Sequence, residues 1–470
     1  MTGQSLNEML SDFAAGLDYA TLPEEVRTHA RFLILDAMGC GIVGSATDEA
    51  AKLHRAVLAM SGGSGNARLW GTDLKAPLPL AVMANSVAVH TREIDDFSLA
   101  YHAGSVVVPA AVGVAEVVGA SGEELIAAVA AGYEVSFRIA MGGAAPGQPG
   151  FLSFKKKGWH STSLFGPFGA AVAAAKLLGL DAAGLRNAIG IAASSAGGTW
   201  AFIDEGNTNK RVHPGLASRC GVAAAFLARE GITGPSRVLE ADWGGFYGTF
   251  LQGEAWYPEH VIRGLGSEWE ILHAGFKPYA SCRRIHSSLD ALFEAARKHG
   301  LAYDDVKAIT INGHHLHKRQ LSKFPVSTVL EAQFSLPYTL SAALKAGSGG
   351  LDLYRPEAMA NPEVALLARN VSIEIDPDLP ETGEPRLDFA LADGRVVSER
   401  VEVPKGHPKN PLTPAELMTK LRTNAALYLP PERVAALSAA LAGLDQVPDV
   451  SALTGLMVSP AVRAGAQANA

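Results

Sequence analysis

The chain has 470 residues, of which 48% are hydrophobic and 19% are charged, and its formal net charge is -7. This composition can fill a large core and argues against an intrinsically disordered chain. The slight acidic excess argues against nucleic acid as the main partner, because nucleic-acid-binding surfaces are basic. The length predicts two or three domains, or one large domain with an insertion.

The expected compartment follows from the lack of a targeting pattern and from the spacing of the cysteines. Residues 1–17 carry no basic start followed by an apolar stretch, so we expect no secretory signal. The apolar run at 106–132 is interrupted by glutamates, which predicts core helices rather than a membrane span. Cys40, Cys220 and Cys282 lack the close spacing of a disulfide framework or of an iron–sulfur motif. We therefore expect a cytoplasmic protein with no membrane partner.

The first 267 residues are predicted to form a helical domain. Small and apolar residues recur there at helical spacing, and the abundant alanine and glycine allow helices to pack closely. Ser121 and Glu124 have the spacing of a capping box, in which each side chain satisfies a backbone group at a helix start. The expected helices cover residues 23–38, 76–90, 109–118, 123–138, 163–178, 182–195 and 216–229.

A smaller α+β domain is predicted over residues 268–405. β-branched residues alternate with polar ones in this part of the chain, as they do in strands. Asp393 and Gly394 predict a tight hairpin turn, because glycine tolerates a positive φ angle there. The expected strands lie at 306–312, at 371–375 and on both sides of the hairpin turn within 386–403, and the expected helices lie at 287–299 and 335–346.

Helical periodicity returns near the end of the chain. Thr413, Pro414 and Glu416 supply an N-cap, a proline at the first helical position and a capping-box acid. Residues 406–460 are predicted to rejoin the first domain, and residues 461–470 to form a flexible tail. The expected helices of this part cover residues 414–428 and 431–444.

The first candidate site segment is the loop at residues 93–105, which lies between two apolar helices. It combines the adjacent carboxylates of Asp95 and Asp96 with the imidazole of His102, and such a set can form an acid/base pair. The alternative is that one of the aspartates only caps the next helix.

The second segment, at residues 155–163, is a run of lysines followed by His160 and a hydroxyl-rich helix start. The free N–H groups of a helix start bind carboxylate or phosphate, so His160 lies where it could meet an anion. The alternative is a solvated lysine run with a histidine buried for packing.

The third segment, at residues 206–215, places Lys210 and His213 before a helix of small residues. Lys210 could clamp an anion or, if desolvated, act as a base. The alternative is an ordinary surface loop.

The fourth segment, at residues 277–286, contains Lys277, Cys282, Arg283 and Arg284. An arginine pairs with a carboxylate through two hydrogen bonds, but two adjacent arginines rarely face the same ligand. The cysteine is interpreted as a small buried hydrophobe rather than a nucleophile.

A histidine cluster, His314, His315 and His317, raises the alternative of a metal-dependent hydrolase. Its spacing matches no standard zinc pattern, so we expect no metal site there. The motifs of nicotinamide-binding proteins, P-loop ATPases and the common serine hydrolases are absent from the sequence.

In these segments the sequence resembles the MmgE/PrpD family, which includes 2-methylcitrate dehydratase, cis-aconitate decarboxylase and iminodisuccinate epimerase. The resemblance implies a large helical bundle domain, a smaller α+β lid domain, a homodimer, and a cleft that binds a small polycarboxylate without metal or organic cofactor. The chain departs from the family pattern at His102-Ala103-Gly104, where a proline commonly follows the histidine, and at Phe97. The matching stretches are HTREIDDFSLAYHAGSVVVPAAVGVAE, AAVAAGYEV, GWHSTSLFGPFGAAVAAAKLLGL, NAIGIAASSAGG, NKRVHPGLASRCGVAAAFLAREGITGP, FKPYASCRRIH and EAQFSLPYTLSAAL.

The resemblance also implies which residues form the site. The implied catalytic residues are Asp95, His102, His160 and Lys210, and the implied substrate-binding residues are His213, Lys277, Arg284 and Tyr338.

The expected reaction is that of a lyase, most simply the dehydration of a 2-methylcitrate-like hydroxy acid. A base, His160 or Asp95, would remove a proton next to a carboxylate, and an acid, His102, would protonate the leaving hydroxyl, or the two roles would be reversed. Decarboxylation and epimerisation share the enolate-like intermediate and stay open as alternatives. A non-catalytic polycarboxylate-binding protein is the alternative from another class.

Overall fold

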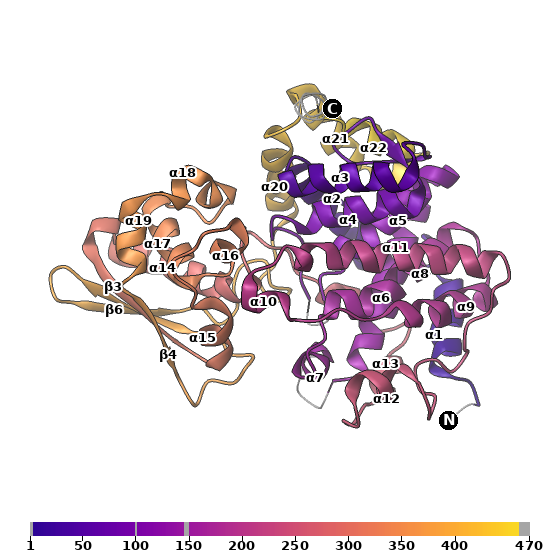
Figure 1. The fold of residues 1–470 in the computed structure, drawn as a ribbon, viewed down its shortest axis with the longest axis horizontal. Helices are drawn as coiled ribbons and strands as arrows, with labels where there is room; N and C mark the ends of the chain where they lie inside the picture. Colours follow the sequence, from indigo (N-terminus) through magenta and orange to yellow (C-terminus); the bar gives the residue numbers. More distant parts are fainter. Residues whose placement is uncertain (1–2, 99–100, 145–149, 460–470) are drawn as a thin grey trace.

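The computed structural model describes residues 3–98, 101–144 and 150–459, and these fold into two units that lie side by side (Figure 1). The larger unit is built from helices with one very short hairpin, and the smaller one combines helices with a four-stranded sheet. The predicted mainly α fold with an α+β unit between its first and last helices is therefore confirmed. The tail predicted at residues 461–470 lies outside the described residues.

Helices α1 to α13 make up the body of the helical unit, and strands β1 and β2 form its short hairpin. The capping box predicted for Ser121 and Glu124 is confirmed at the start of α6. The elements are α1 (Leu6–Gly16), α2 (Glu24–Ser45), α3 (Asp48–Ser61), β1 (Ala67–Arg68), β2 (Lys75–Ala76), α4 (Leu78–His90), α5 (Gly104–Val118), α6 (Gly122–Met141), α7 (Gly150–Lys156), α8 (Ser161–Leu177), α9 (Ala182–Ala192), α10 (Phe202–Glu205), α11 (Asn209–Arg229), α12 (Phe246–Leu251) and α13 (Pro258–Ile262).

Helix α8 forms the centre of this unit, where it packs against α5, α6, α9 and α11. Every residue from 162 to 175 is buried, and most of them are alanine, glycine or other small residues. A Cβ atom on Gly221 of α11 would lie 2.5 Å from the carbonyl oxygen of Pro167 in α8, so this helix contact requires glycine. The small residues thus bring the helices close together, as the composition predicted.

Two helices begin earlier than the sequence predicted. Helix α5 begins at Gly104 rather than at residue 109, and α11 begins at Asn209 rather than at residue 216. Pro109 and Pro214 therefore lie inside helices, although proline favours the first helical position. Both helices pack against α4 and α8, and we attribute their extra turns to this packing, which outweighs the lost backbone hydrogen bond.

The α+β unit is built on a sheet with the strand order β4-β3-β5-β6, in which β3 and β4 are parallel and the other pairs are antiparallel. Gly394 has a φ angle of 88° in the turn between β5 and β6, so the hairpin predicted at Asp393 and Gly394 is confirmed. Helix α14 packs against β5 and β6, and α17 packs against α14. The elements are α14 (His286–His299), β3 (Val306–Gly313), α15 (His315–Leu321), α16 (Val329–Gln333), α17 (Leu336–Ala346), α18 (Pro356–Met359), α19 (Pro362–Ala368), β4 (Val371–Ile375), β5 (Arg386–Leu391) and β6 (Val396–Arg400).

The last helices lie against the first unit, with α20 and α21 packed on α2. Thr413 caps α20, with Pro414 as its first residue and Glu416 as the capping-box acid, as predicted. The domain boundaries at residues 267 and 405 stay a prediction. The remaining elements are α20 (Pro414–Ala426), α21 (Pro431–Ala442) and α22 (Ser451–Leu456), with 3₁₀ turns η1 (Ala193–Ser195), η2 (Glu270–His273), η3 (Arg283–Ile285), η4 (Tyr303–Asp305), η5 (Leu351–Tyr354) and η6 (Leu444–Gln446).

No single helix of the described residues is long and apolar enough to cross a membrane. The pair α2 and α3, which is bent by 88°, meets the length and composition test when taken together.

Candidate active site

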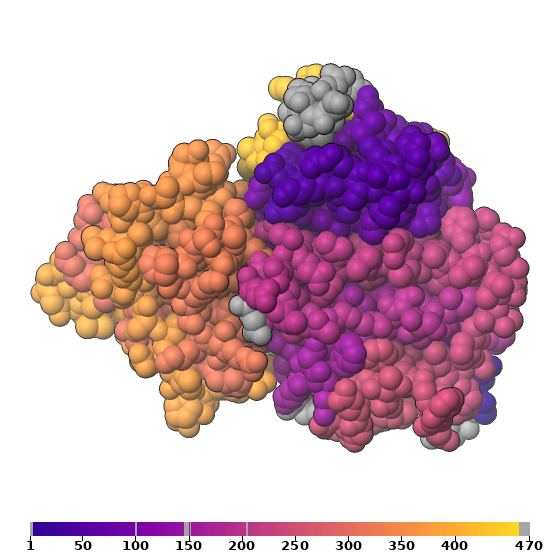
Figure 2. All heavy atoms as spheres, viewed as in Figure 1, coloured from indigo at the N-terminus to yellow at the C-terminus, as the bar shows by residue number. Residues whose placement is uncertain are grey.

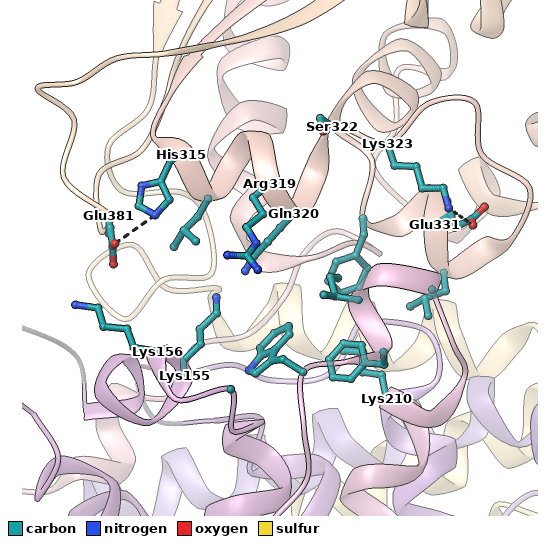
Figure 3. A pocket seen from close by; sticks show the side chains of 18 of the residues that line it. Lys155, Lys156, Lys210, His315, Arg319, Gln320, Ser322, Lys323, Glu331 and Glu381 are labelled. Atoms are coloured by element: carbon teal, nitrogen blue, oxygen red, sulfur yellow. Dashed lines mark hydrogen bonds and ion pairs between the residues drawn. The ribbon is translucent and has the colours of Figure 1, made fainter. Parts of the chain in front are cut away.

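The two units meet along a seam that Figure 2 shows between the orange part and the indigo-to-magenta part. Two adjoining cavities lie along it, with volumes of about 580 Å³ and about 290 Å³. Leu152, Lys155, Trp200 and Lys210 of the helical unit line both cavities, as do residues of the α+β unit. We call the smaller cavity the inner cavity and the larger one the outer cavity (Figure 3).

The inner cavity brings together four of the eight predicted site residues, His102, His160, Lys210 and Arg284. Three others, Asp95, Lys277 and His213, are buried beside it and contact those residues or their neighbours.

The last predicted residue, Tyr338, lines neither cavity. It lies in the core of the α+β unit, and its hydroxyl donates to the carbonyl oxygen of Leu353 at 2.5 Å. The prediction for Tyr338 rested on the family resemblance alone.

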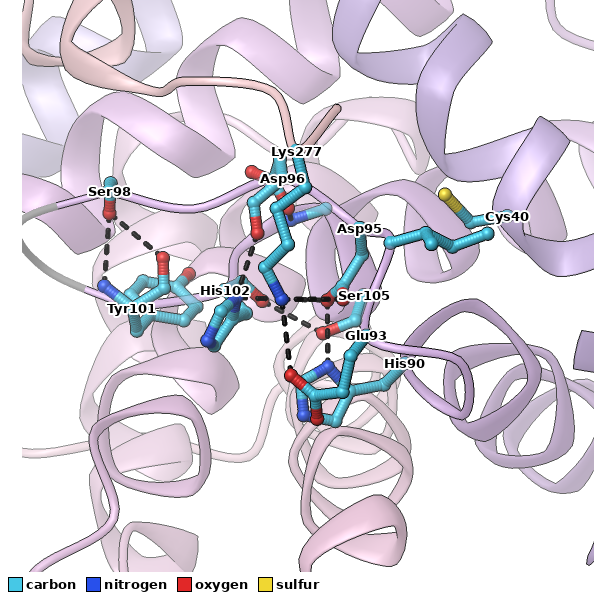
Figure 4. Close-up of polar contacts among 12 residues, drawn as sticks. Cys40, His90, Glu93, Asp95, Asp96, Ser98, Tyr101, His102, Ser105 and Lys277 are labelled. Atoms are coloured by element: carbon cyan, nitrogen blue, oxygen red, sulfur yellow. Dashed lines mark hydrogen bonds and ion pairs between the residues drawn. The ribbon is translucent and has the colours of Figure 1, made fainter. Parts of the chain in front are cut away.

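A buried ionic cluster adjoins the inner cavity, and Figure 4 shows His90, Glu93, Asp95 and Lys277 of this cluster. Lys210 Nζ donates to a Glu93 carboxylate oxygen and, at 2.9 Å, to His90 Nε2. Lys277 Nζ donates to the other Glu93 oxygen at 3.1 Å and lies 3.6 Å from an Asp95 oxygen. His90 Nδ1 then donates to Asp95 at 2.7 Å. We call these five side chains the floor cluster.

The floor cluster balances its own charges, because two ammonium groups face two carboxylates. Burial raises the pKa of Glu93, but the ammonium groups of Lys210 and Lys277 outweigh this and hold it well below its ordinary value. Burial also raises the pKa of Asp95, but His90 and Lys277 lower it below the ordinary range. Lys277 shows the converse, because Glu93 and Asp95 outweigh burial and raise its pKa. Both carboxylates and Lys277 are thus ionised at neutral pH.

The loop before α5 holds these groups through strong local constraints. Glu93 has a φ angle of 55°, a left-handed conformation that is uncommon outside glycine. Phe97 pairs with Gly275 through two backbone hydrogen bonds, which ties the loop to the segment that carries Lys277. Asp96 accepts hydrogen bonds from the Gly104 backbone N–H at 2.9 Å and from the Tyr133 hydroxyl. The capping alternative thus holds for Asp96, while Asp95 belongs to the floor cluster.

His102 projects from this loop into the inner cavity. Its Nδ1 atom lies 2.8 Å from the carbonyl oxygen of Asp96, so Nδ1 carries the proton and Nε2 is left as an acceptor. Burial and the charge of Lys277 lower its pKa to about 3. His102 is therefore a neutral imidazole with a free lone pair, which is the form of a general base.

His160 and His213 form a second, separate pair, in which the two Nδ1 atoms lie 2.9 Å apart. The Asn209 amide nitrogen lies 3.2 Å from His213 Nε2, and an amide N–H can only donate. His213 Nε2 is then an acceptor, so its Nδ1–H donates to His160 Nδ1. That leaves the proton of His160 on Nε2. Burial and His213 hold the pKa of His160 well below its ordinary value, so this residue is a neutral proton donor.

Helix α11 explains how Lys210 and His213 reach the site. The sequence was interpreted as a loop there, but both residues lie in the first two turns of α11. Lys210 is 3% exposed and His213 is 4% exposed, because this end of the helix packs into the body of the unit. The surface-loop alternative is therefore wrong.

The chain is covered by two protein-family models. MmgE/PrpD N-terminal domain matches residues 8–259, and MmgE/PrpD C-terminal domain matches residues 279–446.

The chain belongs to the MmgE/PrpD family.

Several curated relatives share the printed name "Cis-aconitate decarboxylase". The Aspergillus terreus protein is 30% identical over 475 residues, which cover 95% of each chain. The human protein is 29% identical over 486 residues, covering 97% of this chain and 95% of its own. The mouse protein is 28% identical over 485 residues, covering 98% of this chain and 95% of its own. The similarity to these enzymes thus extends over both units.

Two side chains of the histidine cluster of this MmgE/PrpD protein contact charged residues. His314 Nε2 lies 3.3 Å from Arg284, and His315 faces Glu381 at 3.4 Å. Among the described residues, the group of three potential ligands that does converge is His90, Asp95 and His102. Its His90 and Asp95 atoms are already hydrogen-bonded to each other, and two ammonium groups of the floor cluster adjoin them. A dication there would meet strong repulsion.

Several site residues of this MmgE/PrpD protein were not predicted from the sequence. His90 looked like the last residue of an apolar helix, and Glu93 was noted only as part of its segment. Lys155 was hidden in a run of three lysines, and Trp200 lay between segments. A signal for Glu93 was present, since it stands two residues before Asp95 in the loop, but nothing in the sequence distinguished Lys155 from Lys156 and Lys157.

Proposed function

We propose that this protein is a lyase that decarboxylates a small unsaturated polycarboxylate of the cis-aconitate type. The observation that carries the proposal is that one cavity holds the proton donor His160 together with Lys155 and Arg284, one cation from each unit, neither of which has an ion pair among the described side chains. The sequence favoured dehydration of a hydroxy acid, but the names of the relatives support decarboxylation instead. The same groups would serve either reaction.

In the proposed reaction the cations hold the carboxylates while one C–C bond breaks. CO₂ leaves from a carboxylate attached to the carbon next to a C=C bond. The electron pair left behind forms a new C=C bond, and the pair of the old one moves onto the carbon beside another carboxylate, which spreads the charge as an enediolate. Charged and polar groups held in fixed positions stabilise such a charge without rearranging.

His160 would complete the reaction by giving its Nε2 proton to that carbon. A neutral imidazole is a weak acid, but a carbanion-like carbon is a much stronger base, so the transfer is favourable. His213 would orient His160, and water would return the proton in the next cycle. His102 carries its proton on Nδ1 and would act as a base or hydrogen-bond acceptor. His160 is then the acid and His102 the base, which is the reversed assignment of the two considered from the sequence.

A panel of acids in D₂O, followed by NMR, tests the proposal. We expect cis-aconitate to release CO₂ and to give a five-carbon unsaturated diacid that carries one deuterium on carbon. Water loss from citrate or 2-methylcitrate without CO₂ release would replace decarboxylation by dehydration. Deuterium uptake into an otherwise unchanged acid would mean epimerisation. Binding without turnover or exchange would leave only the binding-protein alternative.

The homodimer implied by the resemblance also stays a prediction. Size-exclusion chromatography with light scattering would test it, and a mass of one chain (49.1 kDa) at micromolar concentration would contradict it.

A further inference from the structure

The free positive charge of the inner cavity does not lie on Lys210, although the sequence suggested that this lysine could clamp an anion. Lys210 is already paired with Glu93, and the floor cluster as a whole is neutral. His102 and His160 have lowered pKa values and add no charge at neutral pH, and His273 is paired with Glu270. A substrate carboxylate that enters the cavity therefore needs a different cationic partner.

Lys155 is the candidate on the helical side. It stands in the last turn of α7, and its ammonium group lies 4.8 Å from the centre of the Trp200 ring. Figure 3 shows its side chain rising from α7 into the space below Arg319. No described carboxylate lies within 4 Å of its nitrogen, although the side chain is half-buried and lines both cavities. A half-buried ammonium group without a counter-ion is unfavourable unless a ligand supplies one.

Arg284 faces it from the α+β unit. Its guanidinium donates to the backbone carbonyl of Glu381 at 3.3 Å and has no carboxylate partner within 4 Å among the described side chains. The adjacent Arg283, by contrast, is paired with Glu384 at 3.0 Å. The Glu381 carboxylate, which also lines the cavity, is directed to His315. Lys155 and Arg284 thus place two cations without ion pairs on opposite walls of one cavity.

We propose that Lys155 is a substrate-binding residue that, together with Arg284, holds a carboxylate lying away from the reacting carbon. This rests on the proposed function and gives it a substrate class, namely acids with an anionic group beyond the two carboxylates that take part in the reaction. A carboxylate between the two cations removes their mutual repulsion and joins the helical unit to the α+β unit. Acids in which that group is esterified or missing bind weakly.

Calorimetric binding of tricarballylate tests this inference, because this saturated tricarboxylate has no C=C bond and cannot decarboxylate by the proposed route. We expect Lys155→Gln to raise its Kd by about tenfold to a hundredfold, the range for a lost charge-assisted hydrogen bond. Lys155→Arg keeps the charge and should stay within about threefold. Lys157→Gln is the matched control, since Lys157 is two residues away, pairs with Glu254 and lines neither cavity.

The ligand side gives an independent arm that needs no variant. Glutarate, which lacks one carboxylate, should bind the wild type more weakly than tricarballylate and should lose little further affinity in Lys155→Gln. An unchanged Kd for tricarballylate in Lys155→Gln would overturn the inference, as would equal losses in Lys155→Gln and Lys157→Gln. Tight Lys155-dependent binding without turnover of cis-aconitate would instead overturn the proposed function and leave this inference standing.

Discussion

The Nδ1 atoms of His160 and His213 lie 2.9 Å apart, and the Nδ1–H group of His213 donates to His160. His160 is the N-cap residue of α8, and His213 lies in α11, which packs along α8. The contact between these helices thus sets which nitrogen of His160 faces the cavity with a proton.

Replacing His213 by phenylalanine keeps a ring in place and removes the donor to His160. We expect kcat to fall by about a hundredfold, because His160 no longer has a fixed tautomer, with a much smaller change in KM. Steady-state kinetics with cis-aconitate measure both. Unaltered kcat in His213→Phe would show that the pair does not orient the acid.

His102→Gln and His160→Gln should affect turnover far more than binding. General acid–base groups contribute about 10²- to 10⁴-fold to a rate. We expect a loss of that size in kcat for His160→Gln. His102→Gln should show the same loss if His102 acts as a base. Tricarballylate should bind both variants within a few-fold of the wild type, since the cations are untouched. Near-normal turnover in both variants would refute their roles.

Glu93 is the residue whose loss should cost the fold most. Glu93→Gln leaves the ammonium groups of Lys210 and Lys277 facing a single carboxylate in a buried site, at a cost of about 3–5 kcal/mol. The free energy of unfolding, obtained from urea denaturation, measures this. Glu93→Gln combined with Lys277→Met restores the charge balance and should cost less than the sum of the single changes.

A surface ion pair provides the control for that experiment. Glu294 pairs with Arg297 and Lys298 at the surface, so Glu294→Gln should leave the free energy of unfolding nearly unchanged. A Glu93→Gln effect as small as this would mean that the floor cluster is not a closed ionic network.

The affinity for tricarballylate should depend on pH through Lys155. Burial and the charge of Arg284 lower the pKa of this amine to about 8. Cys282 and Glu381 oppose this by raising the pKa, and Arg319 lowers it slightly. The charged form that holds the ligand is present below this pKa and is lost as pH rises through it, whereas the ligand is fully ionised throughout. The Kd should therefore rise between about pH 7 and 9.

Calorimetry across this pH range measures the effect, and Lys155→Arg is its control, because arginine stays protonated. A Kd that rises equally in wild type and Lys155→Arg would assign the pH dependence to another group.

The sequence by itself determined the elements and the family. Capping residues such as Thr413 with Glu416, the Asp393-Gly394 turn and the alternation in 371–375 act within a few residues, so a local pattern was enough to predict them. The starts of α5 and α11 were missed, because packing against other helices extended each helix past the turn that its proline suggested.

Only the tertiary structure decided how the charges of the site are partnered. Lys210 and Lys277 stand 117 and 184 residues from Glu93 in the chain, and no spacing rule connects them. Lys155 is one of three consecutive lysines. It differs from Lys157 because its side chain lines the inner cavity, whose other wall is formed by the α+β unit. Whether a cation is neutralised by the protein or left for a ligand depends on distances between segments far apart in sequence, because Coulomb energy follows separation in space.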